Sequence, residues 1–231
     1  LYLQGQFNGY GINSISATVG TNTITTDDTY MLSPGSYRVR AYHDNTGVEV
    51  YSDEFTVTCP TVTLPLTENF DRTSNMPGCW FTTGDNYSLY ITGCEGRYFS
   101  QPYGAKFHNE FNGYAILATP EIPGGTNNLR VRFKALLGDC YDNGMLYVGT
   151  MSDPSNGSTF NSIQSFEVTN GLGQEWHSFE VWLDEYTGSD THIAFRLSDG
   201  ITENTTTVFI DNIIIDEIPA CLEPYNLAVG A

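Results

Sequence analysis

The chain has very little positive charge. Its 9 lysine and arginine residues stand against 27 aspartate and glutamate residues, and the formal net charge is −18 over 231 residues. Recognition of phosphate groups depends on clustered lysine and arginine side chains. We therefore expect neither nucleic acid nor an anionic membrane surface as a partner. An acidic surface suits a secreted protein.

Long apolar runs and the common catalytic motifs are also missing. No apolar stretch is long enough to cross a bilayer, so no membrane insertion is expected. A CxxC pair, a Cys/His cluster, GxSxG and HExxH are all absent, and the four histidines stand in unrelated contexts. These absences argue against a zinc site and against an enzyme.

The cysteines give only a partial disulfide pattern. Cys79 and Cys94 are close enough in sequence to bridge a loop, but spacing alone does not establish a bond. The odd total leaves at least one cysteine unpaired within the chain. The five cysteines are Cys59, Cys79, Cys94, Cys140 and Cys221.

No segment keeps a helical apolar period over three turns. Short apolar runs separated by Gly, Asn, Asp and Pro occur instead, which is typical of an antiparallel sandwich or jelly roll. We therefore predict an all-β chain. The runs are residues 114–118, 129–136, 145–148, 165–168, 178–183 and 192–197.

Residues 1–59 are also rich in strand signals. Residues 37–42 alternate with period two, residues 44–47 (Asp-Asn-Thr-Gly) supply a turn, and residues 54–58 are the expected partner strand of that hairpin. The pattern resembles the last two strands of a fibronectin type III domain. That resemblance implies an immunoglobulin-like module, partial or variant because its opening strands are missing.

An ordered set of motifs follows, and it resembles the MAM-like, choice-of-anchor J and cleaved-adhesin jelly rolls of Bacteroidetes surface proteins. The resemblance implies a jelly-roll β-sandwich over residues 60–220, with residues 221–231 as the start of another fibronectin type III-like module. The motifs are ENFD (68–71), PGCW (77–80), YAILATPEI (114–122), LYVGTMSDPSNGSTF (146–160), WHSFEVWL (176–183), HIAFR (192–196) and VFIDNIIIDEIPAC (208–221).

The most apolar stretch is residues 206–218, TTVFIDNIIIDEI. Its β-branched and aromatic residues favour a strand with both faces covered. Asp211 lies in the middle of this strand, where burial of a carboxylate is costly unless the group is hydrogen-bonded or bound to a metal. Two interpretations are open: Asp211 is a metal ligand, or it accepts hydrogen bonds from neighbouring backbone or from Asn and Tyr side chains.

The resemblance implies a structural Ca²⁺ site. In related jelly rolls an acidic residue near the first strand approaches an aspartate of the last strand, and the matching positions are Glu68 and Asp211, with Asp71 as a further ligand. Calcium accepts oxygen ligands in irregular geometry. Asp139 and Asp142 are candidates for a second metal, although a hairpin turn explains the same residues. Residues 84–86 (Gly-Asp-Asn) fall where cleaved adhesins have a longer acidic loop.

Aromatic residues supply candidates for a ligand-binding surface. In residues 178–183 strand alternation places Trp182 and Glu180 on the face opposite Phe179, Val181 and Leu183. We expect Trp182 to be exposed or covered by a neighbouring module. Trp80 and Trp176 are expected in core or rim packing. The loop around Tyr98, Phe99, Tyr103 and His108 combines aromatic and polar side chains and is the preferred partner surface.

These features predict a non-catalytic adhesion or interaction module of a secreted or cell-surface multidomain protein. The expected partners are neighbouring modules of the same polypeptide and a host or surface protein or glycan. One alternative is a carbohydrate-binding accessory module of a secreted hydrolase or protease. Another is a structural repeat of a surface filament, which would bind no ligand.

Overall fold

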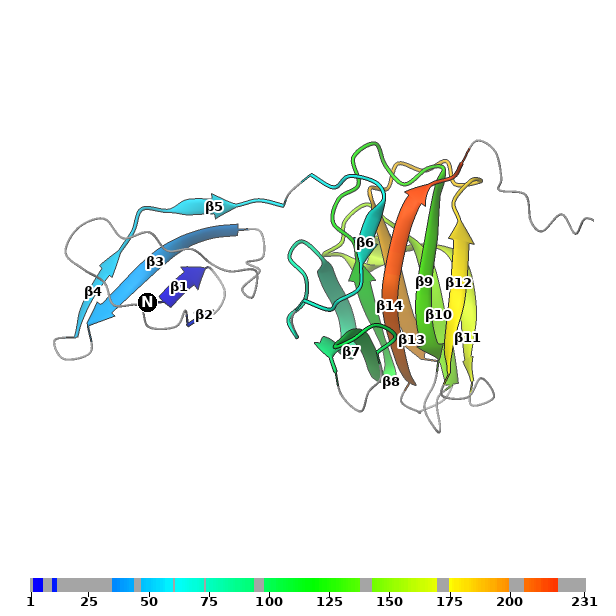
Figure 1. Cartoon of the computed structure of the whole chain (residues 1–231), viewed down its shortest axis with the longest axis horizontal. Helices are drawn as coiled ribbons and strands as arrows, with labels where there is room; N and C mark the ends of the chain where they lie inside the picture. Colours follow the sequence, from blue (N-terminus) through cyan, green and yellow to red (C-terminus); the bar gives the residue numbers. More distant parts are fainter. Residues whose placement is uncertain are drawn as a thin grey trace, which may run out of the picture.

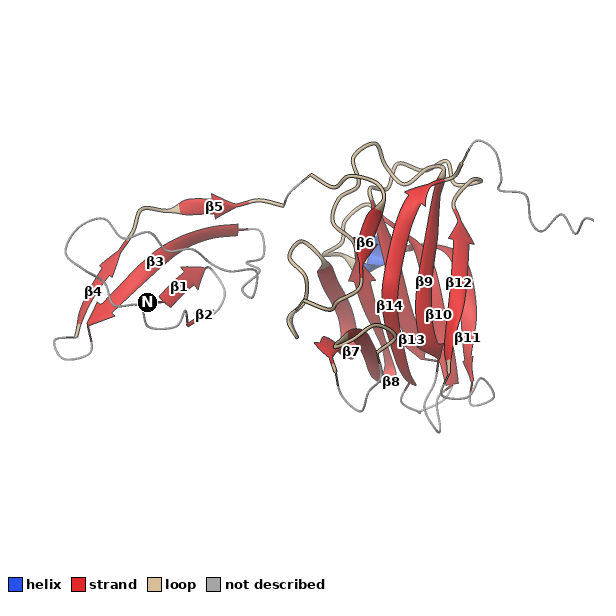
Figure 2. Cartoon of the chain, in the orientation of Figure 1, coloured by secondary structure: helices blue, strands red, loops and turns tan. Residues whose placement is uncertain are grey.

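Figure 1 shows the chain as a computed structural model, which describes residues 2–5, 10–11, 35–43, 47–59, 61–72, 74–93, 98–137, 143–169, 175–199 and 206–219. Strands dominate these ranges, together with one 3-10 turn, η2 (Gly157–Thr159), as Figure 2 shows. Within them no helix is long and apolar enough to span a membrane. The predicted all-β fold is confirmed.

The N-terminal sheet is built around its longest strand, β3 (Gly35–His43). Antiparallel to it lie β1 (Tyr2–Gly5), β4 (Val48–Tyr51) and β5 (Phe55–Val57), and β2 (Tyr10–Gly11) pairs with β1. Residues 54–58 were expected as the partner strand of residues 37–42, and β5 does pair with β3, but only at its start; the hairpin partner across the turn is a strand that the sequence reading did not predict. The direct partner is β4, because residues 52–54 leave the strand conformation before β5 rejoins the start of β3.

The remaining strands form an antiparallel network in the order β11-β10-β13-β8-β14-β9-β12, with β7 paired to β8 and β6 paired to β14. Every predicted apolar run between residues 114 and 218 lies in one of these strands, apart from terminal residues. The strands are β6 (Leu66–Glu68), β7 (Phe81–Thr92), β8 (Gly104–Ala118), β9 (Leu129–Leu137), β10 (Asn143–Met151), β11 (Asn161–Thr169), β12 (Trp176–Trp182), β13 (His192–Asp199) and β14 (Thr206–Glu217).

The network folds over itself into a two-layer sandwich because β8 takes part in both layers. Its first half pairs with β14, and its second half pairs with β13. One layer therefore contains β13, β10 and β11, and the other contains β14, β9, β12 and β6. Their inner faces meet in one core, where the Phe133 ring of β9 lies 5.1 Å from Phe195 of β13 and 6.0 Å from Phe166 of β11. The predicted antiparallel β-sandwich is confirmed.

Strand β7 accompanies β8 through both layers, and here the sequence was misleading. Residues 84–86 were expected in a loop, but they lie inside β7, where the register against β8 shifts between Asp85 and Tyr87. Glycine and acidic or amide residues suit such an irregularity, because a bulge bends the strand.

Strand β14 is the central strand of its layer. Residues 206–211 are all buried, which confirms that both faces of this half are covered, and burial alternates after Asn212. β9 flanks one side of β14 along its length, whereas the other side is flanked by β8 up to Ile210 and by β6 from Ile213. Between these two partners the strand is irregular, and Asn212 has a φ of 49°.

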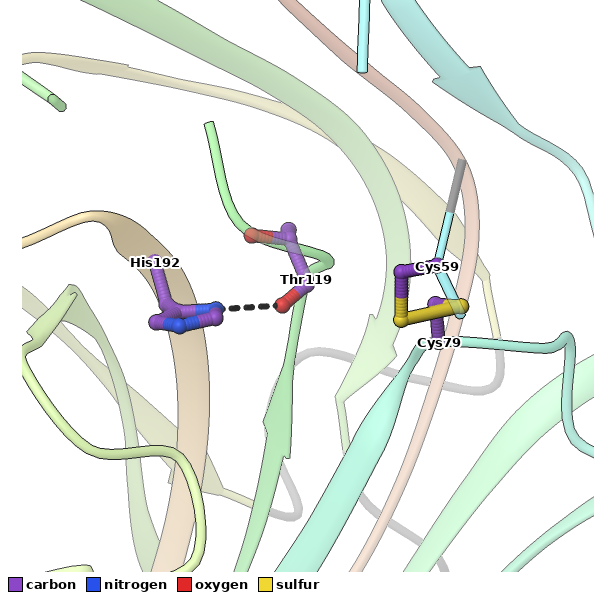
Figure 3. Close-up of a disulfide and its surroundings, with 4 residues drawn as sticks. All are labelled: Cys59, Cys79, Thr119 and His192. Carbon is purple, nitrogen blue, oxygen red and sulfur yellow. Dashed lines mark hydrogen bonds between the residues drawn. A yellow bond between two sulfur atoms is a disulfide. The ribbon is translucent and has the colours of Figure 1, made fainter. Parts of the chain in front are cut away.

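A disulfide joins Cys59 to Cys79, whose Cα atoms are 5.6 Å apart (Figure 3). The alternative that spacing suggested, Cys79 with Cys94, is therefore wrong. Spacing misled because the tertiary fold brings the segment before β6 against the turn before β7. Cys94, Cys140 and Cys221 lie outside the described residues. The bond ties residue 59, the expected end of the first module, to the sandwich, and the module boundaries stay a prediction.

Candidate functional site

Asp211 lies in the gap between the two neighbours of β14, and its side chain is buried. Its Oδ2 accepts hydrogen bonds from the backbone N–H of Phe99 (2.8 Å) and Ser100 (2.9 Å), and its Oδ1 accepts one from the N–H of Asn212 (2.7 Å). The Ser100 hydroxyl lies 3.2 Å from Oδ1. The carboxylate therefore fastens the segment before β8 to the central strand.

The ionisation of Asp211 reflects two opposing effects. Burial raises the pKa of this carboxyl, while the N–H groups of Ser100, Asn212 and Phe99 act in the opposite direction. These backbone N–H donors match the interpretation in which Asp211 accepts hydrogen bonds from neighbouring backbone. Its role as a calcium ligand stays a prediction.

Glu68 and Asp71 lie together in the turn that follows β6. Glu68 Oε1 accepts the N–H of Phe70 (2.7 Å), and Asp71 Oδ2 accepts the side-chain amide of Asn69 (2.6 Å). Burial raises the pKa of Glu68, and the charge of Asp71 adds to this effect. The other oxygen of Asp71, Oδ1, is buried and has no hydrogen-bond partner.

The three predicted calcium ligands do not form a single cluster. Among the described residues, no group of three or more His, Cys, Asp or Glu side chains is placed to hold a metal ion. Glu68 lines a groove of about 650 Å³ together with Arg72, Ser100 and Asn212. Asp139 and Asp142, the second predicted pair, lie outside the described residues.

Trp182 lies at the end of β12, the outermost strand of its layer. The predicted alternation is confirmed, because Val181 and Leu183 are buried in the core. The Arg130 guanidinium lies 5.5 Å from the centre of the Trp182 ring, and it is paired with Asp216 (2.8 Å) and Glu180 (3.2 Å). This ion-pair network supports one face of the tryptophan ring.

A groove of about 630 Å³ opens beside Trp182, where the edge strands β11 and β12 of the two layers meet. It combines two aromatic rings with amide, hydroxyl and carboxylate groups. Its lining residues are Asn161, Ser162, Ile163, Gln164, Trp182, Asp184, Glu185, Tyr186, Thr187 and Gly188.

The other predicted ligand-binding residues are spread apart. Tyr103 packs against the core, and Tyr98 is half-buried in the segment before β8. His108 is in β8 rather than in a loop, and its Nδ1 lies 3.0 Å from the Thr207 hydroxyl. They do not share the groove beside Trp182.

Sequence reasoning included Phe99 in the aromatic loop before β8, but it missed the residues that contact Phe99 on the outer face of the β14 layer. Phe99 is 45 % exposed, and its ring meets Trp176 edge-on at 6.0 Å. Lys134 Nζ lies 4.6 Å from the centre of the Phe99 ring. Trp176 was expected in core or rim packing, and it is half-buried in this contact at the surface. Period-two alternation predicted the outward side chains of each strand, but not the register that aligns them.

His192 is a buried histidine whose contacts are structural. Its Nδ1 lies 2.8 Å from the carbonyl oxygen of Thr119, as Figure 3 shows, and the ring meets Phe81 edge-on at 5.7 Å. It is buried at the start of β13. We assign it to the packing of the layer that contains β13.

No protein-family model and no curated protein matches the sequence. Solved structures match its fold. The K1 cleaved adhesin domain of Lys-gingipain from Porphyromonas gingivalis is 17 % identical, with a TM-score of 0.53 over 67 % of this chain and 99 % of that chain. The K3 domain of the same protein is 18 % identical, with a TM-score of 0.52 over 66 % and 98 %.

A carbohydrate-binding module is similar in the same way. The CBM22-1 xylan-binding domain of Xyn10C from Paenibacillus barcinonensis is 10 % identical, with a TM-score of 0.50 over 71 % of this chain and 100 % of that chain. At these identities the likeness shows the β-sandwich fold alone.

Proposed function

We propose that this chain is a non-catalytic binding module of a secreted or cell-surface multidomain protein, and that it binds carbohydrate in the groove beside Trp182. The observation that carries the proposal is the composition of that groove. The aromatic residues Trp182 and Tyr186 line the groove together with the amide residues Asn161 and Gln164. A few polar groups placed around aromatic surface are what small-ligand sites require.

The tryptophan is held in place before any ligand arrives. Arg130 contacts the ring and is itself fixed by two carboxylates. Hydrogen bonding to Arg130 lowers the pKa of Asp216, so this partner stays ionised at neutral pH. A ring that is already ordered loses little conformational entropy on binding.

The charge of the groove favours a neutral sugar. Asp184 and Glu185 contribute carboxylates, and the lining residues include neither lysine nor arginine. Carboxylates accept hydrogen bonds from sugar hydroxyls, whereas an anionic ligand would be repelled. Neutral polysaccharides are therefore the ligand class that we assign to this groove.

Isothermal titration with soluble neutral polysaccharides, among them xylan, galactan and mannan, tests the proposal. At least one should bind saturably, and Trp182→Ala should weaken it by at least about tenfold, because loss of a central aromatic anchor costs about 2 kcal/mol or more. Tyr51→Ala is the matched control, since Tyr51 is an exposed aromatic residue of the N-terminal sheet. Binding that survives Trp182→Ala, or no binding by any polymer, contradicts the assignment.

A structural calcium site is a second proposal, and it is favoured by the buried, unpartnered Oδ1 of Asp71. Asp71 and Glu68 are the residues that would hold the ion, whose charge would offset their burial. Binding to the folded state alone raises the unfolding midpoint. Calcium should therefore raise the midpoint relative to excess chelator, and the double variant Glu68→Gln, Asp71→Asn should remove the shift. An equal shift in that variant would place the ion elsewhere.

Adhesion through neighbouring modules or host proteins is compatible with the same fold. A structural repeat of a filament is the alternative that predicts no ligand. Titration of the full chain separates these functions, because only the binding module has a saturable partner that depends on Trp182.

A further inference from the structure

A row of side chains crosses the outer face of the β14 layer, and it comes from five different strands. The cross-strand register pairs Tyr90 of β7 with Lys106 of β8, Lys106 with Phe209 of β14, Phe209 with Leu136 of β9, and Leu136 with Trp176 of β12. Chain neighbours of these residues, such as Phe107, Val208 and Ala135, belong to the core. Strand alternation therefore turns the row away from the core. Four strand spacings of about 4.8 Å give the row a length of about 19 Å.

Both lysines of the whole sequence are on this face. Lys106 belongs to the row, and Lys134 lies two residues from Leu136 along β9, pointing to the same side. Lys106 Nζ lies 5.7 Å from the ring centres of Tyr90 and Phe209. Lys134 Nζ lies 4.6 Å from the centre of the Phe99 ring and donates a hydrogen bond to the Ser178 hydroxyl (2.6 Å). We call Tyr90, Phe99, Lys106, Lys134 and Trp176 the lysine–aromatic face.

Among the described residues, no acidic side chain forms an ion pair with either ammonium group. In the part of the chain that the structure describes, the ion pairs involve Arg38, Arg130 and Arg132, and neither lysine. Asp211 is opposite Lys134 in the register of β14 and β9, but its oxygens accept hydrogen bonds from backbone N–H groups. In a chain of net charge −18, this face therefore holds two cations available to an anion.

We propose that the lysine–aromatic face binds an acidic polysaccharide, in which carboxylate groups meet Lys106 and Lys134 and sugar rings lie on Phe99 and Tyr90. A carboxylate that reaches an ammonium group forms a charge-assisted hydrogen bond. Phe99 and Tyr90 are 45 % and 44 % exposed, so their rings offer surface to the apolar side of a sugar. The ligand and the surface both differ from those of the Trp182 groove.

Polygalacturonate and its methyl ester are a matched pair of probes, because they share one backbone and differ in charge. Titration of the full chain should show saturable binding of polygalacturonate, alginate or hyaluronate, and weaker or no binding of the ester. Lys106→Gln and Lys134→Gln should each weaken binding about tenfold, which corresponds to about 1.4 kcal/mol. Added salt should weaken it as well, since exposed charges are screened.

Arg38→Gln is the control for loss of one positive charge, because Arg38 is an exposed cation of the N-terminal sheet. It should leave the affinity unchanged, as should Trp182→Ala, which tests the separate groove. The unfolding midpoint of each variant confirms that it is folded. The proposal is overturned if none of the three acidic polymers binds, or if the methyl ester binds equally well. It is also overturned if Arg38→Gln weakens binding as much as the lysine variants do. If poly-glutamate competes at equal affinity, the ligand is a peptide and the proposal fails.

Discussion

Replacement of Asp211 by alanine is the perturbation whose effect the structure defines most closely. The carboxylate accepts hydrogen bonds from three backbone N–H groups, those of Phe99, Ser100 and Asn212. Alanine leaves all three donors without an acceptor in a buried site. A buried donor without a partner costs about 1–3 kcal/mol. Water molecules that enter the site can accept some of these hydrogen bonds and so reduce the total cost. We therefore expect Asp211→Ala to lower the free energy of unfolding by about 3–4 kcal/mol.

Asparagine at the same position is the matched comparison. Its carbonyl oxygen can still accept from Phe99 and Ser100, but its amide group then faces the N–H of Asn212, where two donors meet. Asp211→Asn should therefore be intermediate between the wild type and Asp211→Ala. Urea unfolding of the three proteins gives the order, and exchange of the Phe99 and Ser100 amide protons should accelerate most in the alanine variant.

The same pair predicts an unusual pH dependence. Burial raises the pKa of Asp211 in the folded protein, so the folded state holds this proton more tightly than the unfolded chain does. The stability that this proton contributes is fully present below the unfolded pKa of about 3.9 and is lost as the pH rises through the higher folded-state pKa. The advantage of the wild type over Asp211→Asn should therefore grow as the pH is lowered from 7 to 4.

Two results would refute this reasoning. If Asp211→Ala changes the free energy of unfolding by less than about 0.5 kcal/mol, the typical size of a surface substitution, the carboxylate does not hold the segment before β8 in place. If the wild type loses its advantage over the asparagine variant on acidification, burial is not the dominant influence on the pKa of Asp211.

Other substitutions test other parts of the sandwich. Cys79→Ser should lower the free energy of unfolding by about 3 kcal/mol under oxidising conditions, because the bond to Cys59 closes a loop with a sequence separation of 20; a reductant should remove the difference. Asp216→Asn should cost about 1 kcal/mol at pH 7. Because hydrogen bonding to Arg130 lowers the pKa of Asp216, this difference should vanish as acid titrates the wild type, and a difference that persists would contradict the ion pair. Gly149→Ala should cost about 2 kcal/mol or more, because a Cβ there would meet the Asn161 backbone; a neutral effect in urea unfolding would contradict that packing.

Local patterns predicted much of the sandwich. Alternation in β12 predicted that Val181 faces the core and that Trp182 does not, because a strand turns successive side chains to opposite faces. The apolar sequence of β14 predicted a strand with both faces buried, and the first half of β14 is buried on both faces. Residues 84–86 were expected in a loop because they fall where cleaved adhesins have an acidic loop, but glycine and acidic residues also fit the irregularity of a long strand.

The sequence alone determined that the chain is an acidic, all-β protein, that Asp211 needs a partner, and that Trp182 lies outside the core. Each of these depends on composition or on neighbours along the chain. The tertiary structure decided which residues meet: Cys59 with Cys79, Phe99 with Trp176, and five strands whose register aligns the lysine–aromatic face. The physical reason is that register and layer packing are set by contacts between residues far apart in the chain, and these leave no local periodicity in the sequence.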